Sequence, residues 1–397
     1  MAREVRQTMA IPEKNEAARG PAGAVTLFLC GDVMTGRGID QILPHPSAPQ
    51  LFEPSVRSAL TYVELAEHVA GKIPRPVSFD YIWGDTLGEL EQLRPDARIA
   101  NLETSVTVSD ESWPSKGINY RMHPDNVPCL TAARIDCCVL ANNHVLDWGR
   151  PGLAETLTVL HGAGIRTAGA GHDAQEAAAP AIMELPGGKR VLVFGFGTEG
   201  SGVGRNWSAT RNRAGVNWIG ELSARAADAI GAKVAGYKRA GDIVIASIHW
   251  GGNWGFEVSS RERVFAHRLI DGAGIDLVHG HSSHHVRGIE VYRGKAILYG
   301  CGDLLNDYEG ISGHESFRGD LGLMYLPTID SASGELRRLV MMPTRIHRLR
   351  VNRAPADGAA WLASTMDREC RKLGAAVTIQ QDGNLALEWR DALRAAS

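Results

Sequence analysis

Short apolar runs along the chain end, one after another, in a polar residue. Residues 25–30 form the first run and lead through Gly31 to Asp32. Four later runs follow the same pattern: residues 97–102 before Glu103, 137–141 before Asn142, 243–248 before His249 and 275–278 before His279. A run of this kind is typical of a buried strand, and parallel strands end at the same edge of their sheet. The pattern therefore predicts strands that carry polar side chains to one edge.

Helical periodicity lies between these runs. Apolar residues recur at three- and four-residue spacing in four stretches, namely residues 84–93, 152–163, 222–239 and 261–273. Further apolar runs at residues 190–195, 295–299 and 321–326 indicate additional strands. Strands that alternate with helices predict an α/β fold built from layers of sheet and helix.

The two ends of the chain lack this pattern. Residues 1–22 mix charges of both signs without an apolar run, which predicts a disordered tail. From Ala354 onward the sequence is polar and alanine-rich, so we expect residues 351–397 to form a C-terminal appendage. Residues 23–350 are then expected to form one large catalytic domain.

The composition excludes several classes of protein. The 397 residues are 44% hydrophobic and 22% charged, with a formal net charge of −3, so no basic excess favours nucleic acid as a partner. The six cysteines include no CxxC pair and are too sparse for a disulfide scaffold. The first twenty residues lack the apolar run of a signal peptide or membrane anchor. We therefore expect a cytoplasmic protein without a membrane anchor.

Two segments carry the strongest candidate chemistry. Residues 142–147 read NNHVLD, where the amide oxygen of Asn143 can bind a metal and His144 can point toward a substrate as an acid. An asparagine-capped turn is the alternative for this segment. Residues 279–285 read HGHSSHH, and four histidines directly after an apolar run favour metal or substrate contact over a solvated loop. Together with the polar residues at the strand ends, they predict a divalent-metal centre.

Other polar residues are weaker candidates. Asp85 could face the site or open the helix that follows it, and its position favours the helix start. Lys116, Tyr120 and Arg121 could bind an anionic group of a substrate, because arginine grips carboxylate or phosphate in a bidentate manner. A solvated loop explains these three residues equally well. Asp303 follows a predicted strand and could support the site or cap a turn.

The order of six motifs resembles the calcineurin-like metallophosphoesterase superfamily, and more closely its CapA-type branch of poly-γ-glutamate capsule-synthesis proteins. The motifs are GDVM at 31–34, NLET at 101–104, NNHVLD at 142–147, HWG at 249–251, GHSSHH at 280–285 and YGCGD at 299–303. The resemblance spans residues 25–350. It implies a four-layer α/β/β/α sandwich that holds two divalent metal ions, with Mn, Zn, Fe and Ca all open.

The resemblance also implies a set of metal ligands. In chain order they are Asp32, Glu103, Asn143, His249, His281 and His285. Glu103 corresponds to the carboxylate that bridges the two metals, and Asp32 belongs to the second metal site. The first motif departs from the family pattern, because Met34 stands where many members have a histidine.

Three residues are candidate catalytic groups, namely His144, His284 and Asp85. His144 corresponds to the residue that faces the substrate and protonates its leaving group. His284 is also the alternative to His285 as a metal ligand, and the sequence leaves that choice open.

Three functions are compatible with these residues. The first is hydrolysis by a metal-activated water, with a phosphoester or a peptide or polyglutamate-type molecule as substrate. The second is metal-assisted epimerisation of a peptide, in which flanking bases exchange an α-proton. The third is a non-catalytic accessory role in the synthesis of capsule or poly-γ-glutamate. The sequence predicts a small molecule or peptide as the partner and leaves the oligomeric state open.

Overall fold

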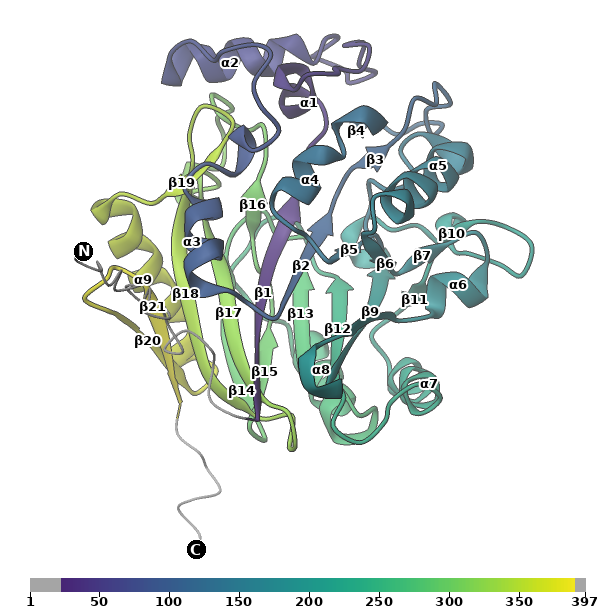
Figure 1. The fold of residues 1–397 in the computed structure, drawn as a ribbon, viewed down its shortest axis with the longest axis vertical. Helices are drawn as coiled ribbons and strands as arrows, with labels where there is room; N and C mark the ends of the chain where they lie inside the picture. The colour runs from purple at the N-terminus through teal and green to yellow at the C-terminus, as the bar shows by residue number, and fades with distance from the viewer. Residues whose placement is uncertain (1–22, 390–397) are drawn as a thin grey trace, which may run out of the picture.

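Two large sheets organise residues 23–389, which are the residues that the computed structural model describes (Figure 1). The first sheet has ten strands, in the order β20-β21-β18-β17-β1-β2-β5-β6, with β16 beside β1 and β19 beside β18. These strands are β1 (Ala24–Val33), β2 (Ala97–Leu102), β5 (Cys137–Val139), β6 (Arg166–Ala168), β16 (Asp303–Leu305), β17 (Leu321–Asp330), β18 (Leu336–Ile346), β19 (Val351–Arg353), β20 (Ala375–Ile379) and β21 (Leu385–Trp389). Strand β1 pairs in parallel with β2 and β16 and antiparallel with β17.

The second sheet has seven strands, in the order β11-β9-β12-β13-β15-β14, with β8 beside β9. They are β8 (Ala181–Glu184), β9 (Arg190–Thr198), β11 (Trp218–Gly220), β12 (Ile243–His249), β13 (Leu277–His281), β14 (Ile289–Tyr292) and β15 (Lys295–Leu298). Two small pairs complete the strands, β3 (Ser105–Val106) with β4 (Arg121–Met122) and β7 (Ala170–Gly171) with β10 (Gly215–Val216). The mixed α/β architecture expected from the alternating pattern is therefore confirmed.

The helices are α1 (Gly38–Ile42), α2 (Leu60–Ala70), α3 (Thr86–Leu93), α4 (Pro128–Ala132), α5 (Gly149–Gly162), α6 (Ala174–Ala178), α7 (Ala224–Ala235), α8 (Ser260–Gly272) and α9 (Ala356–Arg371). Four of them, α3, α5, α7 and α8, match the predicted periodic stretches to within a few residues at most ends, and the other helices were not predicted. Helix α8 begins at a capping box, in which Ser259 and Glu262 each accept a hydrogen bond from the other's backbone N–H. Within residues 23–389, none of the helices has the length and apolar composition that crossing a bilayer requires.

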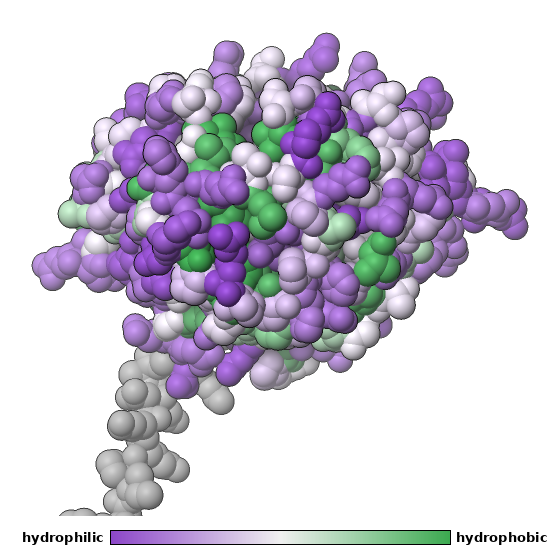
Figure 2. Space-filling view, turned by 90° about the horizontal axis from the view of Figure 1, so that it is seen from above, coloured by the Kyte–Doolittle hydropathy of each residue, from purple (hydrophilic) through white to green (hydrophobic). Residues whose placement is uncertain are grey.

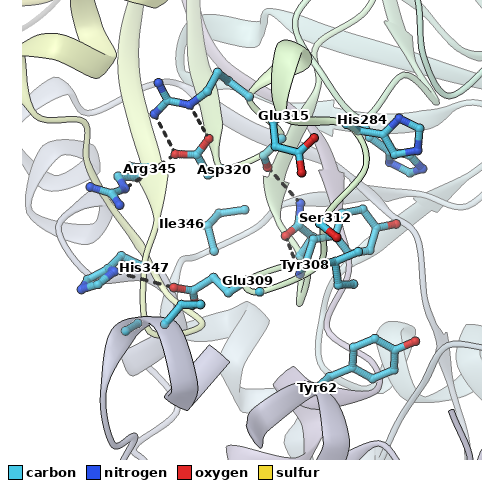
Figure 3. A pocket seen from close by; sticks show the side chains of 18 of the residues that line it. Tyr62, His284, Tyr308, Glu309, Ser312, Glu315, Asp320, Arg345, Ile346 and His347 are labelled. Atoms are coloured by element: carbon cyan, nitrogen blue, oxygen red, sulfur yellow. Dashed lines mark hydrogen bonds and ion pairs between the residues drawn. The ribbon is translucent and has the colours of Figure 1, made fainter. Parts of the chain in front are cut away.

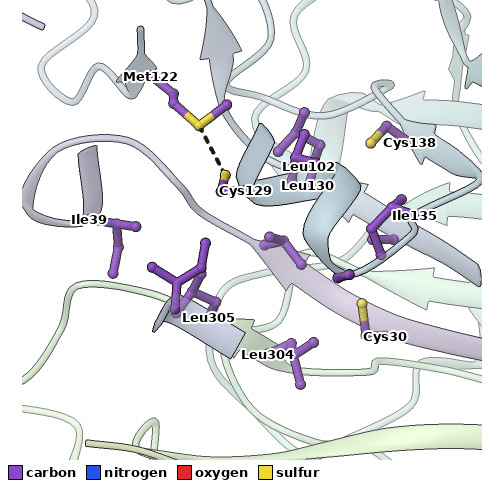
Figure 4. Packing of buried hydrophobic residues seen from close by; sticks show 14 of the residues in the cluster. Cys30, Ile39, Leu102, Met122, Cys129, Leu130, Ile135, Cys138, Leu304 and Leu305 are labelled. Carbon is purple, nitrogen blue, oxygen red and sulfur yellow. Dashed lines mark hydrogen bonds between the residues drawn. The ribbon is translucent and has the colours of Figure 1, made fainter. Parts of the chain in front are cut away.

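The alternation of side chains along β1 explains how the layers pack. Leu27 and Leu29 lie in a core cluster to which strands of both sheets contribute. Phe28 and Cys30 point the other way, into a second cluster that includes residues of α2, α3 and α5. Figure 4 shows part of that second cluster around Cys30. A third cluster joins the other face of the second sheet to α7 and α8.

The segment expected to be a C-terminal appendage is part of the first sheet. Strand β21 pairs with β18 and with β20, so residues 375–389 extend the sheet by two strands. Leu362, Met366 and Cys370 of α9 lie at a four-residue spacing and join the cluster that contains residues of both sheets. The expectation missed these elements because β20 and β21 are short and only partly buried, so their alternation is weak. The predicted N-terminal tail, residues 1–22, lies outside the described residues.

Candidate metal centre

The carboxyl ends of strands from both sheets meet at one place. Strand β1 carries Asp32 there, and β12 and β13 end at His249 and His281, which are register partners. The two sheets touch at this edge, because the backbone N–H of Ser282 donates to Asp32 Oδ2 at 3.3 Å and His279 Nε2 lies 2.9 Å from the carbonyl oxygen of Cys30. The site is thus built where two sheets meet.

Asp32, His249 and His281 form the first group of possible metal ligands. One ligand atom from each lies within 4.8 Å of the others, and all three side chains are buried. The Nδ1 atoms of the two histidines are 2.8 Å apart. His249 Nε2 lies 2.9 Å from the amide oxygen of Asn143, which brings that residue to the same group. The structure thus places four of the expected ligands together.

Asp32, His284 and Asp303 form a second group, again with one ligand atom from each within 4.8 Å of the others. Asp303 is the register partner of Asp32 on β16, and its Oδ1 lies 3.0 Å from His284 Nδ1. The close approach of β16 depends on Gly31, because a Cβ there would lie 1.7 Å from the carbonyl oxygen of Gly302. From the sequence alone, Asp303 could support the site or cap a turn, and the motif YGCGD places Gly302 directly before it.

Asp32 is the carboxylate that both groups share, whereas the sequence analysis expected Glu103 in that position. Glu103 lies just beyond the end of β2, with its Oε1 3.7 Å from His144 Nε2 and 4.0 Å from His249 Nε2. Asp32 occupies the central position because β16 inserts directly beside β1. Glu103 follows the neighbouring strand β2, and its buried carboxyl group lies against that of Asp32.

The carboxyl groups of this site are buried, and among the described residues they have no lysine or arginine side chain beside them. Asp32, Glu103 and Asp303 are at most 2% exposed, and no lysine or arginine in residues 23–389 lies within ion-pair distance of them. Burial, followed by the neighbouring Asp303, raises the pKa of Asp32 to about 7. Burial, followed by Asp32, raises the pKa of Glu103. Buried carboxylates are costly unless a positive charge compensates them, so a bound divalent cation would stabilise this arrangement.

The histidines fit the same interpretation. Burial lowers the pKa of His249 and of His281 well below the usual value, which keeps both imidazoles neutral. A neutral imidazole offers a lone pair to a metal, and mixed nitrogen and carboxylate donors suit Zn, Mn and Fe. The donor set therefore fits a divalent metal ion.

His285 is not placed as a ligand, in contrast to the assignment made from the sequence. Its Nε2 accepts a hydrogen bond from the backbone N–H of Gly255 at 3.0 Å, and its Nδ1 donates to the carbonyl oxygen of Val286 at 3.0 Å. Its ring packs against Phe256 and Phe317. His284 and His285 lie in a bend after β13, and of the two only His284 points toward Asp303.

Substituting the two neighbouring histidines with the same residue distinguishes their roles. His285→Phe is expected to retain the metal content while losing about 1–3 kcal/mol of unfolding free energy, because the buried carbonyl of Val286 and the half-buried N–H of Gly255 lose their partner. His284→Phe is expected to lose part of the metal content. Elemental analysis and denaturant unfolding measure the two effects, and a loss of metal in His285→Phe alone would reverse the assignment.

His144 and Asp147 form a hydrogen-bonded pair beside the two ligand groups. His144 Nδ1 lies 2.6 Å from Asp147 Oδ2, and that oxygen also accepts the backbone N–H of Tyr120 at 2.7 Å. Lys116 Nζ lies 2.6 Å from the other oxygen of Asp147. Burial, opposed by Asp147, lowers the pKa of His144 to about 4. A carboxylate on Nδ1 orients the imidazole and directs Nε2 toward the site.

A comparison with known protein families supports the resemblance that the sequence motifs indicated. The family model described as "Bacterial capsule synthesis protein PGA_cap" matches residues 26–308, which is well over half of the chain. This protein belongs to the PGA_cap family. The resemblance to CapA-type proteins noted from the sequence is thereby confirmed.

Relatives of this PGA_cap protein carry related names. Two strains of Mycobacterium tuberculosis contain a probable polyglutamine synthesis accessory protein that is 51% identical over 367 residues, covering 92% of this chain and 96% of the relative. The PGA biosynthesis protein CapA of Bacillus subtilis is 26% identical over 281 residues, covering 70% of this chain and 62% of the relative. The described residues also align with a solved structure of GAP50 of Plasmodium, at 10% identity and a TM-score of 0.31.

Two of the residues predicted from the sequence lie apart from the centre of this PGA_cap protein. Asp85 precedes α3, where its Oδ2 accepts the backbone N–H of Arg353 at 3.0 Å and makes no helix-cap hydrogen bond. Arg121 donates to the carbonyl oxygen of Ser109 at 2.9 Å and stacks over Trp148 at 3.9 Å. Both side chains are occupied by structural contacts.

A cavity of about 590 Å³ opens beside His284 (Figure 3). Tyr120 lines it, which gives this predicted substrate contact a suitable position, while Lys116 lies behind it against Asp147. Arg37 also lines the cavity and was missed from the sequence. A lone arginine in a loop carries no periodic signal, and only its position in the fold distinguishes it.

Proposed function

We propose that this PGA_cap protein is a divalent-metal-dependent hydrolase with a two-metal centre. The observation that carries the proposal is the pair of buried ligand groups that share Asp32, with the His144–Asp147 pair beside them. We further propose that the two sheets and their helices form the α/β/β/α sandwich of the metallophosphoesterase type. The core clusters support this, since one joins both sheets and the others join each sheet to helices.

The ligands divide into two sets around Asp32. Asn143, His249 and His281 would hold one ion together with Asp32, and His284 and Asp303 would hold the other. Divalent ions bound in such a site activate water and polarise the electrophile. Neutral histidines and desolvated carboxylates favour cation binding without competing protonation of the imidazoles.

His144 is the residue proposed to manage the proton of the leaving group. Asp147 holds its ring by Nδ1, so that Nε2 faces Glu103 and the site. Lys116 adds a positive charge 3.0 Å from Nδ1, and this charge favours negative charge on a nearby substrate group. The lowered pKa of His144 leaves Nε2 with a free lone pair near neutral pH, so the imidazole first takes up a proton there and then donates it to the leaving group. The side chains of this segment therefore position one imidazole and one cation beside the ligands.

The names of the relatives, a probable polyglutamine synthesis accessory protein and a PGA biosynthesis protein, connect the proposed chemistry with the synthesis of an amide-linked polymer. Hydrolysis of an amide or phosphoester bond in a peptide or polyglutamate-type molecule fits both the centre and the relatives' role in polymer synthesis. The relatives are called accessory or biosynthesis proteins, and this favours a second candidate function, in which the chain assists polymer synthesis without catalysis.

Metal content and turnover together test the proposal. We expect about two divalent ions per chain by elemental analysis, and we expect chelation to lower the melting temperature, because a ligand that binds only the folded state stabilises it. We also expect new chain ends when the protein is incubated with a glutamate polymer or a phosphoester. Protein without bound metal, without metal-induced stabilisation and without turnover would support the accessory role instead.

The same incubation in deuterated water separates hydrolysis from epimerisation. Hydrolysis produces cleaved products without deuterium at the α-carbon. Uptake of deuterium into an uncleaved peptide would contradict hydrolysis and support α-proton exchange.

A further inference from the structure

The cavity beside His284 is formed mostly by segments outside the metal centre. Its walls come from the end of α2, from the loop that contains Trp254, and from residues 306–320 between β16 and β17. Its volume of about 590 Å³ lies within the range of pockets that enclose an organic ligand. Since His284 belongs to both the cavity wall and the second ligand group, a molecule in this cavity would reach the centre.

The arginines that line this cavity are already paired with carboxylates. Arg318 makes two hydrogen bonds to Asp320, of 2.7 and 2.8 Å, and Arg345 lies 3.7 Å from the same carboxylate. Arg37 donates to Asp307 at 3.1 Å and to Glu53 at 2.9 Å. Each arginine among the described lining residues lies within ion-pair distance of a carboxylate, although Arg318 and Arg345 share Asp320, so the cavity offers little uncompensated positive charge to a polyanion.

The acidic residues of the wall are also occupied. Glu309 accepts the backbone N–H groups of Arg348 and Leu349, at 2.9 and 2.6 Å, and lies 3.6 Å from His347. Glu315 accepts the backbone N–H of Gly313 at 2.9 Å. Figure 3 shows these side chains engaged within the wall. Charge on the wall is therefore largely balanced before any ligand binds.

Apolar and aromatic surface, in contrast, remains open to solvent around the cavity. Val69, Ile118 and Ile311 line it and are 59%, 47% and 47% exposed. Trp254 stacks on His314, with ring centroids 4.0 Å apart and planes 11° apart. Figure 2 views the end of the molecule that carries α2 and shows hydrophobic residues grouped among hydrophilic ones. Exposed apolar surface gathered at a cavity is typical of a binding site for an apolar group.

We infer that this cavity binds an uncharged peptide segment with an aromatic or branched apolar side chain, and not a run of glutamate carboxylates. The inference rests on the proposed function in that it places this segment next to the bond to be cleaved. The exposed side chains of Asn253 and Ser312 on the wall supply the hydrogen-bonding groups that a peptide backbone needs. A substrate of this protein then carries an apolar recognition element beside its reacting bond.

Binding of two capped tripeptides to the metal-free protein tests this inference. The peptides are acetyl-Ala-Phe-Ala-amide and acetyl-Ala-Glu-Ala-amide, and their Kd values are measured by NMR titration. We expect the phenylalanine peptide to bind at least tenfold more tightly. Because no turnover is required, a failure of hydrolysis in the separate assay leaves this result unaffected, and the two proposals can fail independently.

Three matched variants locate the binding site. Ile311→Asp and Val69→Asp are each expected to weaken binding of the phenylalanine peptide at least fivefold, because a carboxylate replaces apolar wall surface. Val264→Asp is the control, since Val264 is 66% exposed on α8 and does not line the cavity. Equal or tighter binding of the glutamate peptide, an equal loss in the control, or binding of neither peptide would overturn the inference.

Discussion

Asp32→Asn is expected to abolish the binding of both metal ions and thereby to lower the activity at least about 1,000-fold. Asp32 is common to both ligand groups, and metal ions in hydrolytic centres contribute several kcal/mol of transition-state stabilisation. An asparagine preserves the size of the side chain but removes its charge. In the metal-free protein the same change relieves a buried carboxylate, so unfolding free energy measured with chelator present is expected to stay level or rise.

Two further variants make this result specific. Asp303→Asn removes a ligand from the second group only, and we expect it to retain about half of the metal content. Glu103 belongs to neither group, so the variant Glu103→Gln is expected to retain more metal than Asp32→Asn. Elemental analysis of all three variants gives the ranking. If Glu103→Gln lost both ions while Asp32→Asn lost one, Glu103 would be the shared carboxylate, as the resemblance to metallophosphoesterases implies.

His144→Ala is expected to lower kcat about 10²–10⁴-fold while the metal content stays unchanged, because its imidazole lies beside the ligand groups without belonging to either. Asp147→Asn is expected to reduce kcat through the same imidazole, since it removes the carboxylate that holds Nδ1. The loss should be smaller for substrates with good leaving groups, such as nitrophenyl esters, which depart without a proton donor. A uniform loss for all leaving groups, or a loss of metal in His144→Ala, would contradict the proton-donor role.

A substitution of Lys116 tests how much its charge contributes compared with the imidazole of His144. Lys116→Met keeps the length of the side chain but removes the charge that lies 2.6 Å from Asp147. Because the imidazole and its carboxylate remain, the expected effect on kcat is smaller than that of His144→Ala. This ordering separates the proton donor from its electrostatic surroundings.

Much of the sheet framework could be read from local patterns. The apolar runs before Asp32, Glu103 and His249 are strands in the structure, since burial on both faces selects an uninterrupted apolar run. The spacing of apolar residues also predicted helices such as α8, because this helix must bury Phe265 and Leu269 on one face. Local alternation therefore predicted which residues end up at strand ends.

In residues 351–389, the local pattern of apolar residues was not sufficient to predict the strands. Strands β20 and β21 lie at the margin of the first sheet, so their apolar alternation is interrupted by half-exposed positions. Their place in the sheet depends on β18, which ends before them in the chain, and no pattern within the segment itself encodes that pairing.

For the candidate metal centre, too, the sequence predicted some features and only the tertiary structure decided others. The sequence by itself determined that Asp32 and His249 lie at strand ends, because each follows an apolar run. The strand predicted to end before His279 continues to His281 in the structure. Only the tertiary structure decided that Asp303 lies opposite Asp32 and that His284, not His285, points toward it. Strand pairing joins residues some 270 positions apart, as Asp32 and Asp303 do, and the direction of a side chain depends on backbone torsions around it. Neither property leaves a periodic trace in the chain, so both are decided only by the assembled tertiary structure.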